Sequence, residues 1–535
     1  MSLIMKNKLI ISCFLVATLQ LSCTKDLDQL NTDPTQASAA TFDPNLLLPS
    51  AQWNYVTSAS GYNGPILFQS MWVQVLASTT SGAANYYSNA DKYVISSNTA
   101  NYQQGTWNTG FQGASFAYEM EQLAKTRPAL ANLGHAAVIM QVQTLANISD
   151  TYGDIPYTQA LQGKGGLTLP AYDTQESAYK SMLTRLETAT AALNATGGTL
   201  TNDAFAYKGN IAQWKKYGYS LMLKLAMRLT KADPATAKTF AEKAVAGGVF
   251  TSVSDDAYVM GDDSKGFGNG NGGALSTLAD VYQVRWSKTM IDYLKATNDP
   301  RLSRIAEVPA DGLTANQDMN SVGNSSPAAQ LGLPNGFDMN GGTTDISRSP
   351  GFPGATGTGA NATPIGRYSR PTMMYRNRSA PLFVLTYAEV SLLMAEAATR
   401  GFNVGNTAAQ HYRNGVIAGM LSLAKYGATI DAATATTYAD ANPLVTANAL
   451  KQINEQYWAT TGLLLNFSEA WNNWKRSGFP VLTPVNYVGN FSNGQIPRRQ
   501  PYPTGEATLN TTNYESAVGK LSGGDNWVAR SWWDK

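Results

Sequence analysis

The feature that most constrains the fold is an apolar stripe between residues 210 and 248. Five residues recur there at the spacing of one helix face: Trp214, Tyr217, Leu221, Leu225 and Leu229. Asp233-Pro234 then supplies an N-cap and a proline for the first turn of a second helix, which ends at Gly247-Gly248. Two helices joined by a tight turn form one tetratricopeptide-like unit. Such a unit buries its apolar face only against neighbours, so more pairs are expected.

Similar periodicity supplies those neighbours. Helices are predicted over 133–151 and 175–194, a helical pair over 386–424, and two further helices over 442–476. The fold class is therefore predicted to be mainly α, a tetratricopeptide-like helical-repeat scaffold. Residues from about 250 to 380 are rich in Gly, Asn, Ser and Thr, and 480–535 are rich in Pro, Asn and Gly. Both stretches are predicted to be long loop excursions, and such loops on a rigid scaffold commonly carry the binding surface.

Composition narrows the function classes. Charged residues make up 14% of the chain and the formal net charge is +2, which disfavours nucleic-acid binding because phosphates require a strong basic excess. The two cysteines are Cys13 and Cys23, so neither a disulfide nor a thiolate metal site is expected after residue 23. The two histidines, His135 and His411, are too few for a histidine-rich metal site and are interpreted as structural.

The N-terminal segment is typical of a secretory signal. Basic residues precede a short apolar run over 9–17, which leads to Leu21-Ser22-Cys23. A small residue before a cysteine suits lipoprotein signal peptidase, so 1–22 are predicted to be a lipoprotein signal peptide, although Gln20 occupies a position that is usually aliphatic. Cys23 is then the lipidated residue at the start of a tether over 23–50. An ordinary signal peptide with a chance cysteine is the alternative.

Several motifs follow one another in a fixed order. The longest covers residues 152–161, with the sequence Tyr-Gly-Asp-Ile-Pro-Tyr-Thr-Gln-Ala-Leu. Shorter ones lie at 31–35, 214–216, 298–302, 385–390, 469–471, 476–480 and 532–534. In these residues the chain resembles the SusD/RagB family of outer-membrane nutrient-uptake lipoproteins, along almost the whole mature sequence.

The resemblance implies a single SusD-like helical domain over 51–535. It implies a surface-exposed, lipid-anchored protein of the outer membrane, partnered by a SusC-like TonB-dependent transporter. It also implies capture of an oligosaccharide or glycan fragment, with a peptide as the alternative ligand, and neither catalysis nor a cofactor. A surface glycoside hydrolase and a structural adhesin remain competing hypotheses.

Acidic residues offer two weaker alternatives. Glu389 and Glu396 lie seven residues apart on one helix and would be the acid and base of a glycosidase, but Glu396 is also placed to pair with Arg400. Acidic and amide side chains in the glycine-rich loop would suit calcium, although their spacing fits no EF-hand: Asp255, Asp256, Asp262, Asp263, Asn269 and Asn271. We expect no metal, and we interpret both sets as structural.

Ring-bearing residues are the best candidates for ligand contact. Sugar recognition needs flat apolar faces beside amides or hydroxyls, and a cluster within 72–111 combines the two outside helical spacing. Two tyrosines of the later loop region are expected to face it. The predicted ligand-binding residues are Tyr86, Tyr87, Asn89, Tyr93, Trp107, Tyr368 and Tyr375. The alternative is that these rings pack the loops onto the helices.

Overall fold

The computed structural model describes residues 42–80, 86–95, 99–276 and 284–535. The chain divides into two units, Met1–Pro44 and Asn45–Lys535, and the second holds almost all the described residues. Its first long helix, α3, begins at Leu48, so the last residues assigned to the tether are already helical. Cys23 lies outside the described residues.

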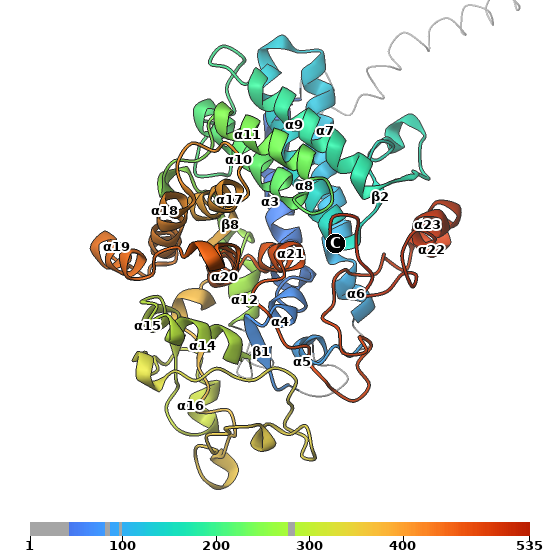
Figure 1. The fold of residues 1–535 in the computed structure, drawn as a ribbon. Helices are drawn as coiled ribbons and strands as arrows, with labels where there is room; N and C mark the ends of the chain where they lie inside the picture. The colour runs from blue at the N-terminus through green and yellow to red at the C-terminus, as the bar shows by residue number, and fades with distance from the viewer. Residues whose placement is uncertain (1–41, 81–85, 96–98, 277–283) are drawn as a thin grey trace, which may run out of the picture. The chain divides into compact units, whose positions relative to one another are not determined.

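One group of helices forms the first half of the scaffold (Figure 1), and each packs against the next in the chain or in space. Helix α3 packs on α7, α7 on α8, α8 on α9, and α9 on α10, which pairs with α11. Their bounds are Leu48–Ser58 (α3), Gly105–Lys125 (α7), Ala131–Tyr152 (α8), Gln175–Ala192 (α9), Ile211–Arg228 (α10) and Pro234–Gly247 (α11). Asp233 caps α11 by accepting from the Thr236 amide at 3.1 Å, as the Asp-Pro sequence predicts.

A second helical group continues the stack because α17 packs on α10. Its members are α17 (Tyr387–Thr399), α18 (Ala408–Leu421), α19 (Ala432–Ala441), α20 (Ala449–Leu463) and α21 (Phe467–Ser477). Thr386 and Glu389 form a capping box at the start of α17. Adjacent pairs pack side by side, so the predicted tetratricopeptide-like helical scaffold is confirmed.

The segment between the two groups holds short elements. Antiparallel pairs join β1 (Leu76–Ser78) to β5 (Val284–Trp286), β4 (Ala257–Met260) to β8 (Pro381–Leu385), and β6 (Ala306–Glu307) to β7 (Arg370–Pro371). A fourth pair joins β2 (Ile155–Pro156) to β3 (Tyr172–Asp173) within the first helical group. Short helices among the described residues are α4 (Gln69–Trp72), α5 (Tyr86–Asp91), α6 (Thr99–Gln103), α12 (Gly270–Ala274), α15 (Leu302–Ile305), α16 (Leu313–Gln317), α22 (Glu506–Leu509) and α23 (Thr511–Val518).

Helix α14 (Lys288–Ala296) corrects the prediction that 250–380 is loop throughout. Ser287 caps it, and Met290, Ile291 and Leu294 form a buried apolar face, so the helical signal is present but only nine residues long. The glycine-rich sequence on either side obscured it. Likewise α22 and α23 interrupt the predicted C-terminal loop.

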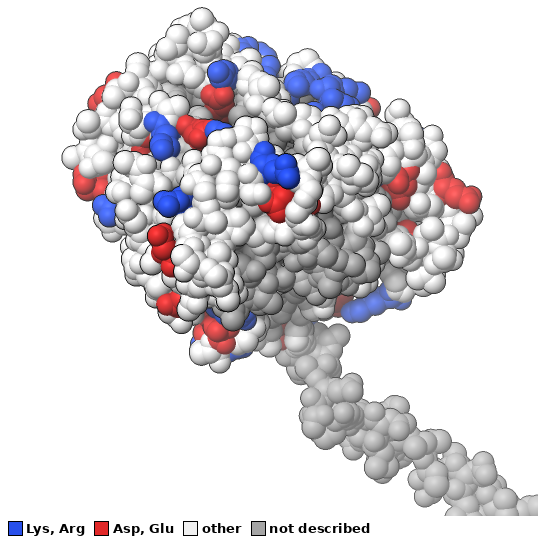
Figure 2. All heavy atoms as spheres, turned by 90° about the horizontal axis from the view of Figure 1, so that it is seen from below, with Lys and Arg blue, Asp and Glu red and all other residues white. Residues whose placement is uncertain are grey.

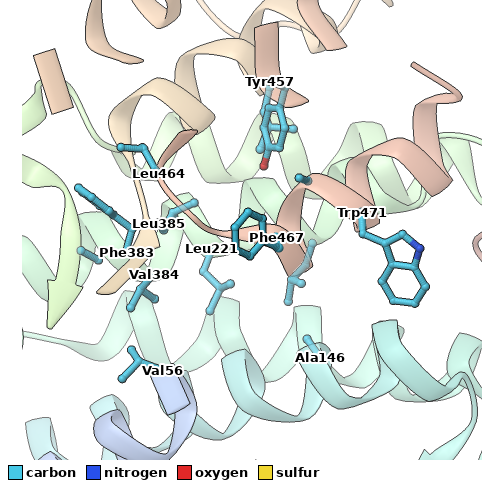
Figure 3. Close-up of a cluster of buried hydrophobic side chains, with 14 of the residues drawn as sticks. Val56, Ala146, Leu221, Phe383, Val384, Leu385, Tyr457, Leu464, Phe467 and Trp471 are labelled. Carbon is cyan, nitrogen blue, oxygen red and sulfur yellow. The ribbon is translucent and has the colours of Figure 1, made fainter. Parts of the chain in front are cut away.

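The hydrophobic core lies where the two helical groups meet. Figure 3 shows side chains from α3, α8, α10, β8, α20 and α21 converging there, among them Val56, Leu221, Val384 and Phe467. These four are at most 2% exposed. The core therefore fixes the scaffold, and the loops that follow β4 and β5 are built upon it.

Candidate ligand-binding cleft

The rings predicted to contact ligand are mostly interior. Five of the seven predicted residues have described side chains, and each is less than 10% exposed: Tyr87, Tyr93, Trp107, Tyr368 and Tyr375. Tyr86 and Asn89 belong to α5, but their side chains lie outside the described part of the structure. None of the five therefore presents a ring face to solvent in this structure, because apolar neighbours cover it.

The structure also separates two of these rings from the rest. Trp107 packs edge-on against Tyr152 at 5.3 Å and Tyr502 at 5.8 Å between ring centroids, in an aromatic cluster at the end of α8. Tyr375 packs on Trp286 at 5.6 Å, and its hydroxyl donates to the Leu463 carbonyl at 2.7 Å. Both arrangements are those of core residues. The prediction that the seven residues share one surface is not supported by these positions.

A cleft of about 580 Å³ lies beside α14, and we call it the α14 cleft. Five short segments line it, and they are far apart in the sequence. They comprise Gln74, the start of α14, and three stretches of loop: 334–337, 343–344 and 483–486. Elements β1, α5 and α14 lie in the lower half of Figure 1. Figure 2 views the molecule from below, and charged side chains are sparse on that face.

Gln74 joins three of the segments at the base of the cleft. Its backbone is left-handed, with φ of 52°, which is unusual for a residue with a side chain. Its amide nitrogen Nε2 donates to the Thr483 carbonyl at 2.6 Å, and its oxygen Oε1 accepts from the Thr289 hydroxyl at 2.7 Å. These two bonds explain why the strained backbone persists, because they tie the turn before β1, α14 and the 483–486 loop together.

Asp91 holds the wall formed by residues 334–337. Its carboxylate accepts from Asn335 Nδ2 at 2.5 Å and from the Gly336 amide at 2.6 Å. Asn335 Nδ2 also donates to the Leu76 carbonyl at 2.9 Å, and its Oδ1 accepts from Ser287. Burial raises the pKa of Asp91 to about 6, against the opposing effect of Lys92 and of these hydrogen bonds. The buried carboxylate of Asp91 therefore holds residues 334–337 in position.

Two of the predicted rings lie behind the cleft walls. Phe337, half-buried in the wall, packs against a small apolar cluster that contains Tyr368. On the opposite side, the backbone carbonyl of Tyr93 accepts from the Phe491 amide at 2.9 Å, which secures the loop that carries Val485. Tyr93 and Tyr368 therefore support the cleft from within rather than line it.

The side chains that do line the cleft are mostly neutral. Thr343 and Asn486 are exposed and offer a hydroxyl and an amide. Lys288 and Asp292, also exposed, form an ion pair with each other along α14. Phe337 and Val485 add apolar surface. This mixture can hydrogen-bond a polyol while its carbon–hydrogen faces lie on apolar side chains.

The paired glutamates of α17 are structural. Glu389 is 1% exposed and Glu396 is 0% exposed, so neither can reach a substrate. Glu389 caps its own helix through Thr386 and lies 3.6 Å from Lys224. Glu396 is held by Arg476 through two bonds of 2.6 Å. The geometry thus gives no support to these two residues as a glycosidase acid and base, which require solvent access and a gap for the sugar.

The acidic loop residues considered for calcium also have protein partners. Asp255 pairs with Lys216 at 2.9 Å, Asp263 with Arg378 at 2.6 Å, and Asp256 accepts from the Tyr387 amide. Among the residues that the structure describes, no group of three or more His, Cys, Asp or Glu side chains is placed to hold a metal ion.

The fold and the cleft define a class: a helical-repeat protein whose irregular loops form a polar cleft. A family model described as "Starch-binding associating with outer membrane" matches residues 36–503, and the chain therefore belongs to the SusD-like family. This confirms the resemblance drawn from the motifs. The curated protein sequences contain no match to this chain.

Solved structures agree with the family assignment. A chitin-binding protein is 28% identical with a TM-score of 0.77, and the alignment covers 92% of this chain and 100% of that one. A Bacteroidetes SusD-like protein, AC2a, is 24% identical with a TM-score of 0.77 over the same shares. A chitin-binding SusD homologue from Flavobacterium johnsoniae is 23% identical, with a TM-score of 0.70, covering 92% of this chain and 98% of its own. The last two, being below 25% identity, support the fold alone.

Within the described residues, no helix is both long enough and apolar enough to cross a bilayer.

Proposed function

We propose that this protein captures a neutral oligosaccharide at the outer membrane and delivers it to a SusC-like TonB-dependent transporter. The observation that carries the proposal is the α14 cleft, whose 580 Å³ volume and amide and hydroxyl lining suit a short glycan. The family description and the 28%-identical chitin-binding structure support a glycan rather than another neutral ligand.

Capture in the cleft requires little rearrangement. Gln74 and Asn335 are already fixed by hydrogen bonds to three neighbouring segments. These two side chains therefore lose little conformational entropy when a ligand binds. The exposed Thr343 and Asn486 then exchange bonds with water for bonds with sugar hydroxyls. The half-buried Phe337 covers an apolar sugar face. Tyr86 and Asn89 stay predicted ligand contacts.

Membrane attachment is the second part of the proposal. Cys23 follows Leu21-Ser22 at the end of the apolar leader, which suits acylation of its thiol after cleavage. We propose that these acyl chains hold the protein at the outer membrane, beside its transporter. The delivery step requires release, so the cleft should bind glycan with moderate affinity and without a covalent step.

Calorimetric titration tests the binding step. The soluble protein starting after Cys23 is titrated with chitohexaose and, separately, with maltohexaose. The double variant T343A/N486A should bind at least tenfold more weakly, because two exposed hydrogen-bonding groups of the cleft are removed. The matched variant T201A/N202A removes the same groups from an exposed loop outside the cleft and should bind like the wild type.

Equal affinities for T343A/N486A and the wild type would contradict the cleft as the binding site. Binding of a random peptide mixture in place of either glycan would contradict the ligand class.

A further inference from the structure

A second groove of about 550 Å³ lies against α19, and we call it the α19 groove. One wall is a continuous stripe of α19 that includes Thr434, Thr437 and Tyr438. The other is the turn that follows α14, with Thr297, Asn298 and Pro300. The groove is nearly as large as the α14 cleft, and the predicted ligand residues do not include any of the residues that line it.

A buried network makes the two walls of the α19 groove rigid. Arg301, directly after the turn, is 0% exposed and binds Asp299 through Nη2 at 2.6 Å. The same nitrogen donates to Gln456 Oε1 on α20 at 3.0 Å. Gln456 in turn donates to the Tyr438 hydroxyl at 3.5 Å. The turn, α20 and α19 are therefore linked in series, and the groove is preorganised rather than a gap between loose parts.

The chemistry of the α19 groove matches a neutral polyol. Among the described residues that line it, none is charged. Thr437 and Asn298 are exposed and supply a hydroxyl and an amide, while Pro300 and Ala441 supply apolar surface. Asn298 has a left-handed backbone with φ of 54°, and the bonds of Asp299 and Arg301 hold the turn in that conformation.

The α19 groove also lies close to the α14 cleft, at the other end of the same helix. Lys288 and Thr289, at the start of α14, line the α14 cleft, whereas Thr297, just past its end, lines the α19 groove. At 1.5 Å per residue, a helix of this length separates the two sites by roughly 14 Å along its axis. A glycan chain that engages both sites therefore has to span at least this distance.

We propose that the α19 groove is a second glycan subsite, which engages the same chain that occupies the α14 cleft. This inference rests on the proposed glycan-binding function. Short oligosaccharides occupy the cleft alone, and longer chains gain avidity because the second contact is intramolecular. The protein thereby selects long chains over short ones without a larger single site.

Affinity electrophoresis through gels that contain glycol chitin or soluble starch tests the proposal. The variant N298G/T437A removes an amide and a hydroxyl from the groove, and glycine tolerates the left-handed backbone at 298. It should lose at least fivefold in affinity for the polymer that retards the wild type, while its calorimetric affinity for the matching disaccharide, which is too short to reach the groove from the cleft, changes less than twofold. The control N202A/T436A alters an exposed loop and a residue of α19 that does not line the groove, and should behave as wild type.

A second variant, A441W, fills the groove from the exposed end of α19 without removing a hydrogen bond. It should reproduce the loss of polymer affinity. Unchanged polymer retardation in both N298G/T437A and A441W would overturn the second subsite. Unchanged binding in T343A/N486A would instead overturn the α14 cleft, so the two failures are distinguishable. A wild type that neither polymer retards would contradict both.

Discussion

The helical scaffold and the loop-rich segment use polar side chains in opposite ways. Where the helices pack, charged groups are buried and paired: Arg228 donates to Glu469 at 2.5 Å and Lys224 lies 2.9 Å from the same carboxylate. The two candidate glycan sites, which the loop-rich segment forms together with α19 and the 483–486 loop, are lined mainly by threonine, asparagine and proline. The comparison teaches that most of the recognisable motifs hold the scaffold, whereas the proposed binding surfaces are formed largely by neutral residues outside the motifs, with Asn298 and Pro300 as exceptions.

The motif residues show this most directly. Asp150, at the end of α8, accepts from Arg228 and Asn472 and from the indole of Trp533, so the first helical group and the C-terminal motif share one carboxylate. Lys475 donates to the Asp150 carbonyl, and burial lowers its pKa to about 7. Burying such a network costs desolvation of its charges. Removing one member is also costly, because it leaves the other buried charges without a partner.

The largest expected effect comes from breaking a buried pair of the scaffold. Arg476→Ala leaves the fully buried Glu396 without its bidentate partner, and the free energy of unfolding should fall by about 3–5 kcal/mol. Urea denaturation monitored by tryptophan fluorescence measures it. Arg413→Ala, which removes the exposed pair with Asp440, is the matched control and should leave the midpoint almost unchanged. Similar losses of unfolding free energy in the two variants would contradict the expectation that breaking a buried ion pair costs more than breaking an exposed one.

The next effect concerns the pH dependence of the scaffold. Burial alone would raise the pKa of Glu396, but Arg476 and Arg400 outweigh it and lower the pKa to about 2, from 4.5 when unfolded. The resulting stability, about 3 kcal/mol, is present above pH 4.5 and is lost as the pH falls through about 2. The stability difference between wild type and Glu396→Gln should therefore shrink over that window. A difference that is constant with pH would contradict the low pKa.

The smallest expected effect is the pH dependence that Asp91, which holds a wall of the α14 cleft, contributes to stability. Its sign is opposite to that of Glu396. The pKa of Asp91 is about 6 when folded and 3.8 when unfolded, so its ionisation costs stability above pH 6, and that cost disappears as the pH falls toward 3.8. Between pH 7 and pH 5 the wild type should gain about 1 kcal/mol relative to Asp91→Asn. Thermal unfolding at both pH values measures it. If Asp91→Asn gains as much stability as the wild type between pH 7 and pH 5, another titrating group causes the pH dependence.

The contrast between the helical scaffold and the loop-rich segment also explains which features could be predicted from the sequence. The periodic stripe from Trp214 to Leu229 and the Asp-Pro cap predicted α10 and α11, because a helix face and its cap are local patterns. The ring cluster stays a prediction as a ligand site, although Tyr87, Tyr93 and Tyr375 are only 0–1% exposed. Aromatic composition does not distinguish a binding platform from core. Gln74, Thr343 and Asn486 line the α14 cleft but form no sequence pattern, because they are neutral and lie more than a hundred residues apart in the chain.

The sequence by itself determined the helical scaffold, the family, and the absence of disulfides after Cys23, since helical periodicity, motif order and cysteine count are readable along the chain. Only the tertiary structure decided which polar residues meet water. Burial of Tyr368 behind Phe337, and the gathering of five separate segments, α14 among them, around one cleft, are long-range outcomes of packing. They depend on contacts between distant residues, and no local pattern encodes them.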